Sequence, residues 1–86
     1  NYFNQDISRW DTGNVETMDY MFCCAIVFNK DISSWTTSKV RNMSNMFFNA
    51  IHFNQNISCW DVSNVRNIKN IFYSCSILEE YKPVFN

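Results

Sequence analysis

Apolar and polar positions along this 86-residue chain recur with a fixed period of 25 residues. The segments FNQDISRWDTGNV, FNKDISSWTTSKV and FNQNISCWDVSNV begin at Phe3, Phe28 and Phe53, and repeats 3–27 and 28–52 are identical at 13 of 25 positions. Similarity at a fixed spacing of this length is typical of arrays in which each unit buries an apolar face against its neighbours. The pattern therefore predicts a stack of three equivalent units.

The second half of each repeat carries apolar residues at helical spacing. In the first repeat these are Val15, Met18, Met21, Phe22 and Ala25, at offsets 0, 3, 6, 7 and 10. Such a stripe predicts an amphipathic helix of about three turns, preceded by a Ser N-cap in the later repeats. The matching positions are Val40, Met43, Met46, Phe47 and Ala50 in the second repeat, Val65, Ile68, Ile71, Phe72 and Cys75 in the third, and the caps Ser38 and Ser63.

The first half of each repeat is too short for a helix and has a different pattern. Trp10 and Thr12 alternate around a polar residue, and Ile7 precedes them. Alternation of this kind predicts a short strand whose Trp and β-branched side chains point inward. One strand per unit, each returning through a helix, gives parallel strands side by side.

Stacking of equivalent positions explains why polar as well as apolar residues recur. Identical rings on successive units can stack, which adds about 0.5–1.5 kcal/mol per pair beyond burial. A buried Asn has to be hydrogen-bonded, and a column of Asn can bond to the turn backbone of its neighbours. The predicted ladders are Phe3, Phe28 and Phe53, then Asn4, Asn29 and Asn54, then Trp10, Trp35 and Trp60.

The stretch FNQDISRWDTGNVETMDYMFCCA resembles the BspA-like family of leucine-rich repeats, and in particular its 25-residue branch in mycoplasma-type surface lipoproteins. The resemblance runs from Phe3 to about Ile77; it departs at Thr36, where the other repeats have Asp, and in the third repeat, where Ile replaces both Met. It implies an α/β repeat solenoid of three leucine-rich-repeat-like units, each a short parallel strand plus a helix. It also implies a surface-exposed protein for adhesion and protein–protein contact, without defining catalytic residues.

The repeats predict a single solenoid segment over residues 1–86, with units at 3–27, 28–52 and 53–77. After Ile77 the register is lost, so 78–86 is expected to be an irregular end or the start of a further repeat. Repeat arrays need polar capping units, and neither end shows one. The chain is therefore expected to be a fragment of a longer array.

Composition and charge argue against several classes of function. The net charge of −1 gives no bulk electrostatic attraction to nucleic acid, and no run of about 18 apolar residues predicts insertion into a membrane. His52 is the only histidine, and the four cysteines, two of them adjacent, lack C-x-x-C spacing, so we predict no metal and no cofactor. Free or buried thiols are favoured over a disulfide framework, although both remain open.

No catalytic residue is predicted either. Paired carboxylates serve glycoside cleavage or metal binding, but here they recur at equivalent places, which favours turn or cap roles. Cys59 has no predicted base beside it, since His52 falls in the preceding turn, and a thiol nucleophile needs such a partner. The carboxylates concerned are Asp6, Asp31, Asp11 and Asp61.

The candidates for binding are the variable positions beside the predicted strand. Repeat positions seven and nine change between units, and the exposed strand face of a repeat array is a frequent binding surface. We predict a non-enzymatic structural or protein-interaction module, cell-surface or extracellular, that binds host or neighbouring-cell proteins. The alternative is a virion component, docking to neighbouring proteins in a large assembly such as a viral capsid. The candidate contact residues are Arg9, Asp11, Ser34, Thr36, Cys59 and Asp61.

Overall fold

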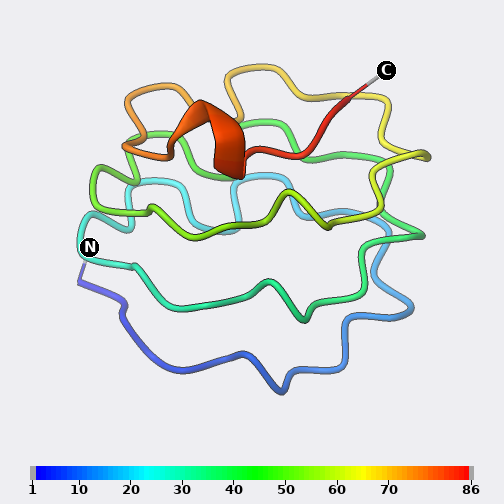
Figure 1. Cartoon of the computed structure of the whole chain (residues 1–86), viewed down its shortest axis with the longest axis horizontal. Coiled ribbons are helices and arrows are strands. Elements are labelled where there is room, and N and C mark those ends of the chain that lie inside the picture. Colours follow the sequence, from blue (N-terminus) through cyan, green and yellow to red (C-terminus); the bar gives the residue numbers. More distant parts are fainter. Residues whose placement is uncertain (1, 86) are drawn as a thin grey trace.

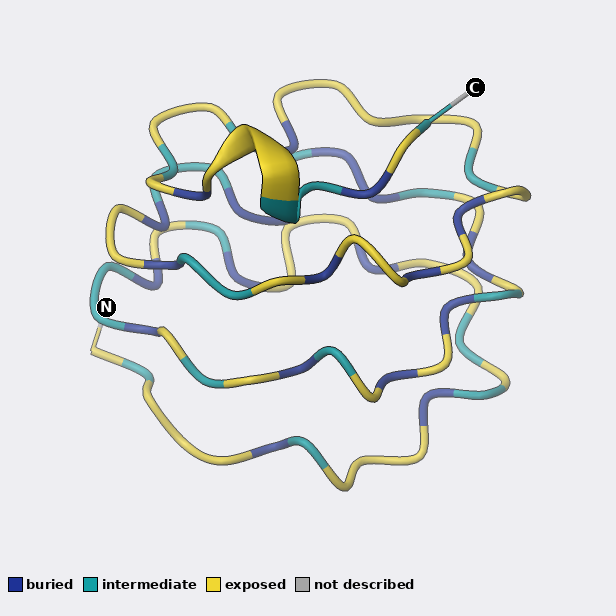
Figure 2. Cartoon of the chain, in the orientation of Figure 1, coloured by how far each residue is buried: buried dark blue, intermediate teal, exposed yellow. Residues whose placement is uncertain are grey.

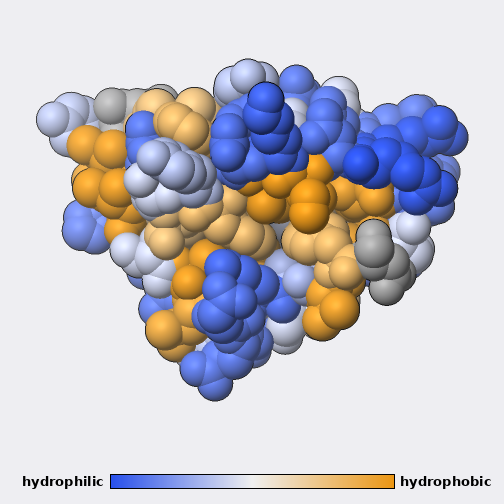
Figure 3. All heavy atoms as spheres, turned by 90° about the horizontal axis from the view of Figure 1, so that it is seen from above, coloured by the Kyte–Doolittle hydropathy of each residue, from blue (hydrophilic) through white to orange (hydrophobic). Residues whose placement is uncertain are grey.

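The chain winds into three coils that lie on top of one another and follow the 25-residue repeat (Figure 1). The computed structural model describes residues 2–85, and its principal extents are 29 × 25 × 21 Å. We call residues 3–27, 28–52 and 53–77 the first, second and third coils. Each coil has a leading half, 3–14 in the first coil, and a trailing half, 15–27. Seen along the stack, the molecule has a three-cornered outline (Figure 3).

The predicted α/β repeat solenoid is wrong at the level of secondary structure. Within residues 2–85 the only helix is the short 3₁₀ helix η1, Glu79–Tyr81, and the only β-pairings are isolated parallel bridges from Thr17 to Asn42 and from Asn42 to Asn67. None of the three coils contains an α-helix or a named strand. The coils are therefore not leucine-rich-repeat-like units of a strand plus a helix.

The trailing half of each coil, predicted as a helix, is a run of tight turns. In the first coil the N–H groups of Met21 and Ala25 donate to the carbonyls of Met18 and Phe22, at 3.2 and 3.1 Å. Turns closed over three residues repeat apolar positions at i, i+3 and i+4, as a helix does. Left-handed backbone recurs twice per coil and is incompatible with a right-handed helix. These residues, with φ between 55° and 61°, are Tyr20, Cys24, Asn45, Asn49, Asn70 and Ser74.

Backbone amides in the trailing halves bond to the next coil. The N–H groups of Met18, Tyr20, Phe22 and Cys24 donate to Asn42, Ser44, Met46 and Phe48 at 2.7–3.0 Å. Bonding at every second residue is the spacing of a parallel ladder. The second coil repeats the arrangement on the third, with Met43, Asn45, Phe47 and Asn49 as donors to Asn67, Lys69, Ile71 and Tyr73 at 2.8–2.9 Å.

The leading half, predicted as a strand, is a turn followed by extended backbone. The N–H of Trp10 donates to the Ile7 carbonyl at 3.1 Å, and the equivalent bond recurs in the other two coils. The turn still directs the recurring Ile inward, because Ile7, Ile32 and Ile57 are all buried. Figure 2 shows that buried positions recur at equivalent places from coil to coil. The core therefore runs along the inside of the stack.

Aromatic rings stack in columns through this core. Phe28 lies 5.7 Å from Phe3 and 5.8 Å from Phe53, measured between ring centroids. Trp35 lies 6.2 Å from Trp10 and 6.4 Å from Trp60. A third column, formed by side chains of the wrongly predicted helices, consists of Phe22, Phe47 and Phe72, whose ring centroids are 5.4 and 5.7 Å apart.

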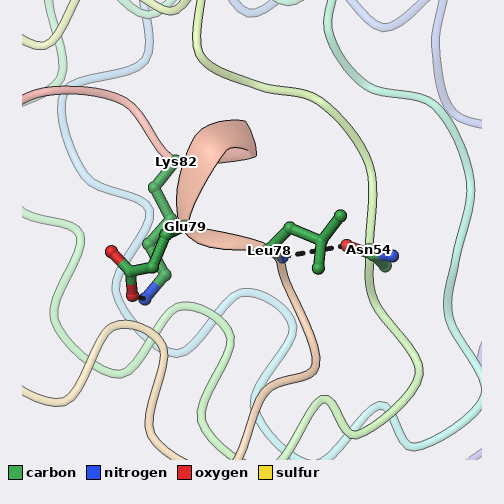
Figure 4. A network of polar contacts seen from close by, with 4 residues as sticks. All are labelled: Asn54, Leu78, Glu79 and Lys82. Carbon is green, nitrogen blue, oxygen red and sulfur yellow. Dashed lines mark hydrogen bonds and ion pairs between the residues drawn. The ribbon is translucent and has the colours of Figure 1, made fainter.

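The recurring Asn residues link the leading halves. Asn4 Oδ1 accepts a hydrogen bond from the Asn29 N–H at 3.4 Å, and Asn29 Oδ1 accepts one from the Asn54 N–H at 2.8 Å. Asn54 Oδ1 in turn accepts the Leu78 N–H at 3.0 Å (Figure 4). Leu78 thus takes the next place in this ladder, one residue earlier than the 25-residue period requires.

Residues 78–85, the C-terminal segment, cover the leading half of the third coil. The Ile57 N–H donates to the Tyr81 carbonyl at 3.0 Å. Lys82 Nζ lies 5.3 Å from the centroid of the Phe72 ring and pairs with Glu79 at 2.5 Å (Figure 4). The segment therefore adds a partial fourth layer over one half of this end.

Candidate functional site

The six predicted contact residues lie at equivalent places of the three coils, on turns and adjoining extended backbone rather than on a strand face. All six are exposed. Ser34 Oγ donates to the Ser8 carbonyl at 3.2 Å, and Cys59 Sγ donates to the Ser33 carbonyl at 3.4 Å. Because the Ser34 and Cys59 side chains bond to the preceding coil, the stack fixes the places of these two. We call the six residues together the exposed ridge: Arg9, Asp11, Ser34, Thr36, Cys59 and Asp61.

The recurring carboxylates cap turns. Asp6 Oδ1 accepts the Ser8 N–H at 3.0 Å, and Asp31 Oδ1 accepts the Ser33 N–H at 2.9 Å. These backbone hydrogen bonds lower the pKa of both carboxyls. Asp61 accepts the hydroxyl and the N–H of Ser63 at 2.7 and 3.0 Å; the hydroxyl is the larger cause of its lowered pKa. We call Asp6, Asp31 and Asp61 the cap aspartates.

A lowered pKa suits the cap aspartates to a structural role. A general acid has to hold its proton near neutral pH, which requires a carboxyl pKa raised toward 7. Hydrogen bonds donated to the carboxylate act in the opposite direction, because they stabilise the charged form. Asp11 has the same geometry, since its Oδ1 accepts the Gly13 N–H at 3.2 Å.

The four cysteines are free thiols. Cys23 and Cys24 lie side by side with their sulfur atoms 3.5 Å apart; burial, and then the hydrogen bond with Cys24, raises the pKa of Cys23. Burial also raises the pKa of Cys75. Nucleophilic thiols are those whose pKa is lowered by a neighbouring base or cation. Among residues 2–85 no hydrogen bond joins Cys59 to His52, and the Cys59 thiol donates to the Ser33 carbonyl instead.

A surface hollow of about 300 Å³ lies beside the ridge, between the second and third coils. Its lining is polar, and Gln55 Nε2 donates to the carbonyl and the side-chain oxygen of Asn29 at 3.0 and 2.9 Å. Polar linings of this kind suit hydrogen-bonding groups of a protein partner. Of the lining residues, only Cys59 was among the predicted contact residues, although most of the others belong to the recurring D/N-I-S motif. The lining residues are Asp31, Ser33, Gln55, Asn56, Ser58 and Cys59.

The described part of the chain shows neither a metal-binding cluster nor a membrane-spanning helix. Residues 2–85 contain no group of three or more His, Cys, Asp or Glu side chains placed to hold a metal ion. Within the same residues, no helix has the length and apolar character needed to cross a membrane.

Comparisons with known proteins place the chain at the level of a family. No curated protein matches it, and no solved structure does. The family described as "Mycoplasma protein of unknown function, DUF285" matches residues 1–83. The predicted resemblance to BspA-like repeats is supported only at this coarser level, and the 25-residue branch stays a prediction. Since the match covers nearly its whole length, the chain belongs to the DUF285 family of Mycoplasma proteins.

Proposed function

We propose that the chain is a non-enzymatic protein-interaction module of a cell-surface or extracellular protein, and that it binds other proteins through the exposed ridge and the adjoining hollow. The observation that carries this proposal is that inner positions of the repeat are identical between coils while an exposed position varies. The Asn ladder and the Phe, Ile and Trp positions of the core keep the same residues from coil to coil. In contrast, Arg9, Ser34 and Cys59 occupy one exposed position with three different side chains. A stack that holds variable groups at fixed spacing is suited to recognising a protein surface.

The absence of an enzymatic role is part of the same proposal. It is supported by the cap aspartates, whose hydrogen bonds favour the ionised form, and by Cys59, whose thiol is bonded to a carbonyl. Membership of the DUF285 family is compatible with a surface repeat module and assigns no activity.

The test is saturable binding of the fluorescently labelled chain to animal epithelial cells, measured by flow cytometry before and after surface proteins are removed with protease. The ridge variant Ser34→Arg with Cys59→Arg is expected to bind about tenfold more weakly, because bulky charge enters the contact surface. A matched control adds the same charge elsewhere, at Ile51→Arg and Val84→Arg, where the side chains are 45% and 82% exposed. Wild-type binding by the ridge variant, or no protease-sensitive binding by the unaltered chain, would overturn the proposal.

A further inference from the structure

Two arginines lie one above the other on the side of the stack, in the second and third coils. The Arg41 N–H donates to the Glu16 carbonyl at 2.8 Å, and the Arg66 N–H donates to the Arg41 carbonyl at 2.7 Å. These bonds place the three residues in successive layers, which lie about 4.8 Å apart in hydrogen-bonded parallel backbone. Within residues 2–85 no ion pair joins either guanidinium to a carboxylate. Like charges on facing positions repel, and here no ion pair offsets the repulsion.

A surface hollow of about 190 Å³ lies beside this arginine column. Lys39 Nζ, at the hollow, donates to Asn14 Oδ1 at 3.0 Å, and Asn64 Nδ2 donates to the Ser38 carbonyl at 2.7 Å. These hydrogen bonds fix a cation and an amide in the wall of the hollow. The lining residues come from all three coils, so the hollow belongs to the side of the stack and to neither end: Glu16, Lys39, Arg41 and Asn64.

We propose that Lys39, Arg41 and Arg66, which we call the basic wall, bind the sulfate esters of a sulfated polysaccharide. The three cations share this surface with one carboxylate, that of Glu16, and all four side chains are exposed. A guanidinium donates paired hydrogen bonds to an oxyanion, so an anionic group between two guanidiniums replaces their repulsion by attraction. A local cluster of this kind attracts anions although the whole chain carries a net charge of −1.

The groups beside the basic wall favour a polysaccharide over nucleic acid and over a membrane surface. Proteins that bind single-stranded nucleic acid stack its bases on aromatic side chains, and none of the described residues that line the hollow is aromatic. Binding at a membrane surface adds apolar side chains that enter the lipid, and the same lining contains none of these. Asn64 supplies an amide oxygen, which can accept a hydrogen bond from a sugar hydroxyl.

The basic wall shares no residue with the exposed ridge, so this inference does not rest on protein binding. The experiment is isothermal titration calorimetry of the 86-residue chain with a heparin oligosaccharide of defined length, at several NaCl concentrations. Three contacting cations predict that log K falls with log[NaCl] with a slope of about −2 to −3, because bound counterions are released. The slope is measured without cells or protein partners, so it tests this site alone.

Variants of the hollow should change heparin affinity in opposite directions. Arg41→Gln and Arg66→Gln should each weaken binding about tenfold and make the salt slope shallower by about one unit, because each removes one charged contact. Glu16→Gln should strengthen binding about threefold, because it removes the carboxylate that repels the sulfate groups. Lys30→Gln is the matched control, since it removes a positive charge outside the basic wall, and it should bind like the unaltered chain.

Comparison ligands separate sulfate esters from other anions. Heparin whose sulfates have been removed should not bind, and a DNA oligonucleotide and phosphatidylglycerol vesicles should bind more weakly than heparin. The proposal is rejected if heparin does not bind, if desulfated heparin binds as well, or if DNA or the vesicles bind more tightly. It is also rejected if Arg41→Gln and Arg66→Gln both behave like Lys30→Gln. Circular dichroism checks the fold of each variant, and if an arginine variant is unfolded, a salt slope near zero or unstrengthened binding by Glu16→Gln rejects the site.

Discussion

Trp35→Ala tests whether stacked rings hold the coils together. Trp35 is 4% exposed, its ring lies between Trp10 and Trp60, and its Nε1–H donates to the Ile7 carbonyl at 3.0 Å. Truncating a buried aromatic residue costs about 3–5 kcal/mol, from lost transfer energy and the cavity that remains. The Ile7 carbonyl keeps the Trp10 N–H at 3.1 Å, so no buried acceptor is left unpaired. The lower part of that range, about 3–4 kcal/mol, is therefore expected.

Trp10→Ala is the matched control, since it removes the same residue type from the same column. Trp10 is 54% exposed, so its loss should cost only about 1–2 kcal/mol. Urea unfolding followed by circular dichroism measures the free energy of unfolding of both variants. The values are comparable if the free energy depends on urea concentration with the same slope in each. If Trp35→Ala is too unstable to fold, Trp35→Phe is the milder substitution, with about 1–2 kcal/mol expected. If Trp35→Ala and Trp10→Ala lowered the free energy of unfolding equally, burial between the coils would not be what makes the ring stabilising.

Three further predictions concern the left-handed backbone positions, the loss of stability at low pH and the reactivity of the thiols. Ser74→Gly should raise the free energy of unfolding by about 0.5 kcal/mol, because Ser74 has a φ of 55°, while Ser38→Gly should lower it by about 0.5–1 kcal/mol. Urea unfolding measures the free energy of unfolding of both variants. A loss of stability in both would indicate a helix in the trailing half instead of a run of turns. The lowered pKa of the cap aspartates means that their stabilisation is complete above the ordinary value of 3.8 and is lost as pH falls through the lowered folded values. Thermal unfolding against pH should show this fall, and Asp31→Asn should reduce it; an identical profile for that variant would exclude Asp31 as a cause. Iodoacetamide should modify Cys75 more slowly than Cys59, because burial raises the pKa of Cys75, and timed mass spectrometry that shows equal rates would contradict this.

The sequence predicted the register of the stack but not its secondary structure. Equivalent residues 25 apart do lie against one another, as the Phe28 and Trp35 rings show. The helix prediction failed because tight turns such as those ending at Met21 and Ala25 repeat apolar residues at the same spacing as a helix. The signal against a helix was the Asn within the stripe of the second and third coils, Asn45 and Asn70, because Asn tolerates left-handed backbone.

The candidate site was predictable in part, for a related reason. Positions such as Arg9 and Ser34 could be identified as exposed and variable from the repeat alone. The bond from Ser34 to the preceding coil could not, because it depends on the turn between Ile7 and Trp10, where the alternation of side chains predicts a strand.

The most direct test of the stacked coils is the NMR measurement of scalar couplings across hydrogen bonds. Couplings are expected from the Met18 nitrogen to the Asn42 carbonyl carbon and from the Phe47 nitrogen to the Ile71 carbonyl carbon, whose N···O distances are 2.8 and 2.9 Å. Couplings from residue i to residue i−4 within 15–25, 40–50 and 65–75 would instead show the helices that the apolar spacing indicates, and would contradict the stack of turns.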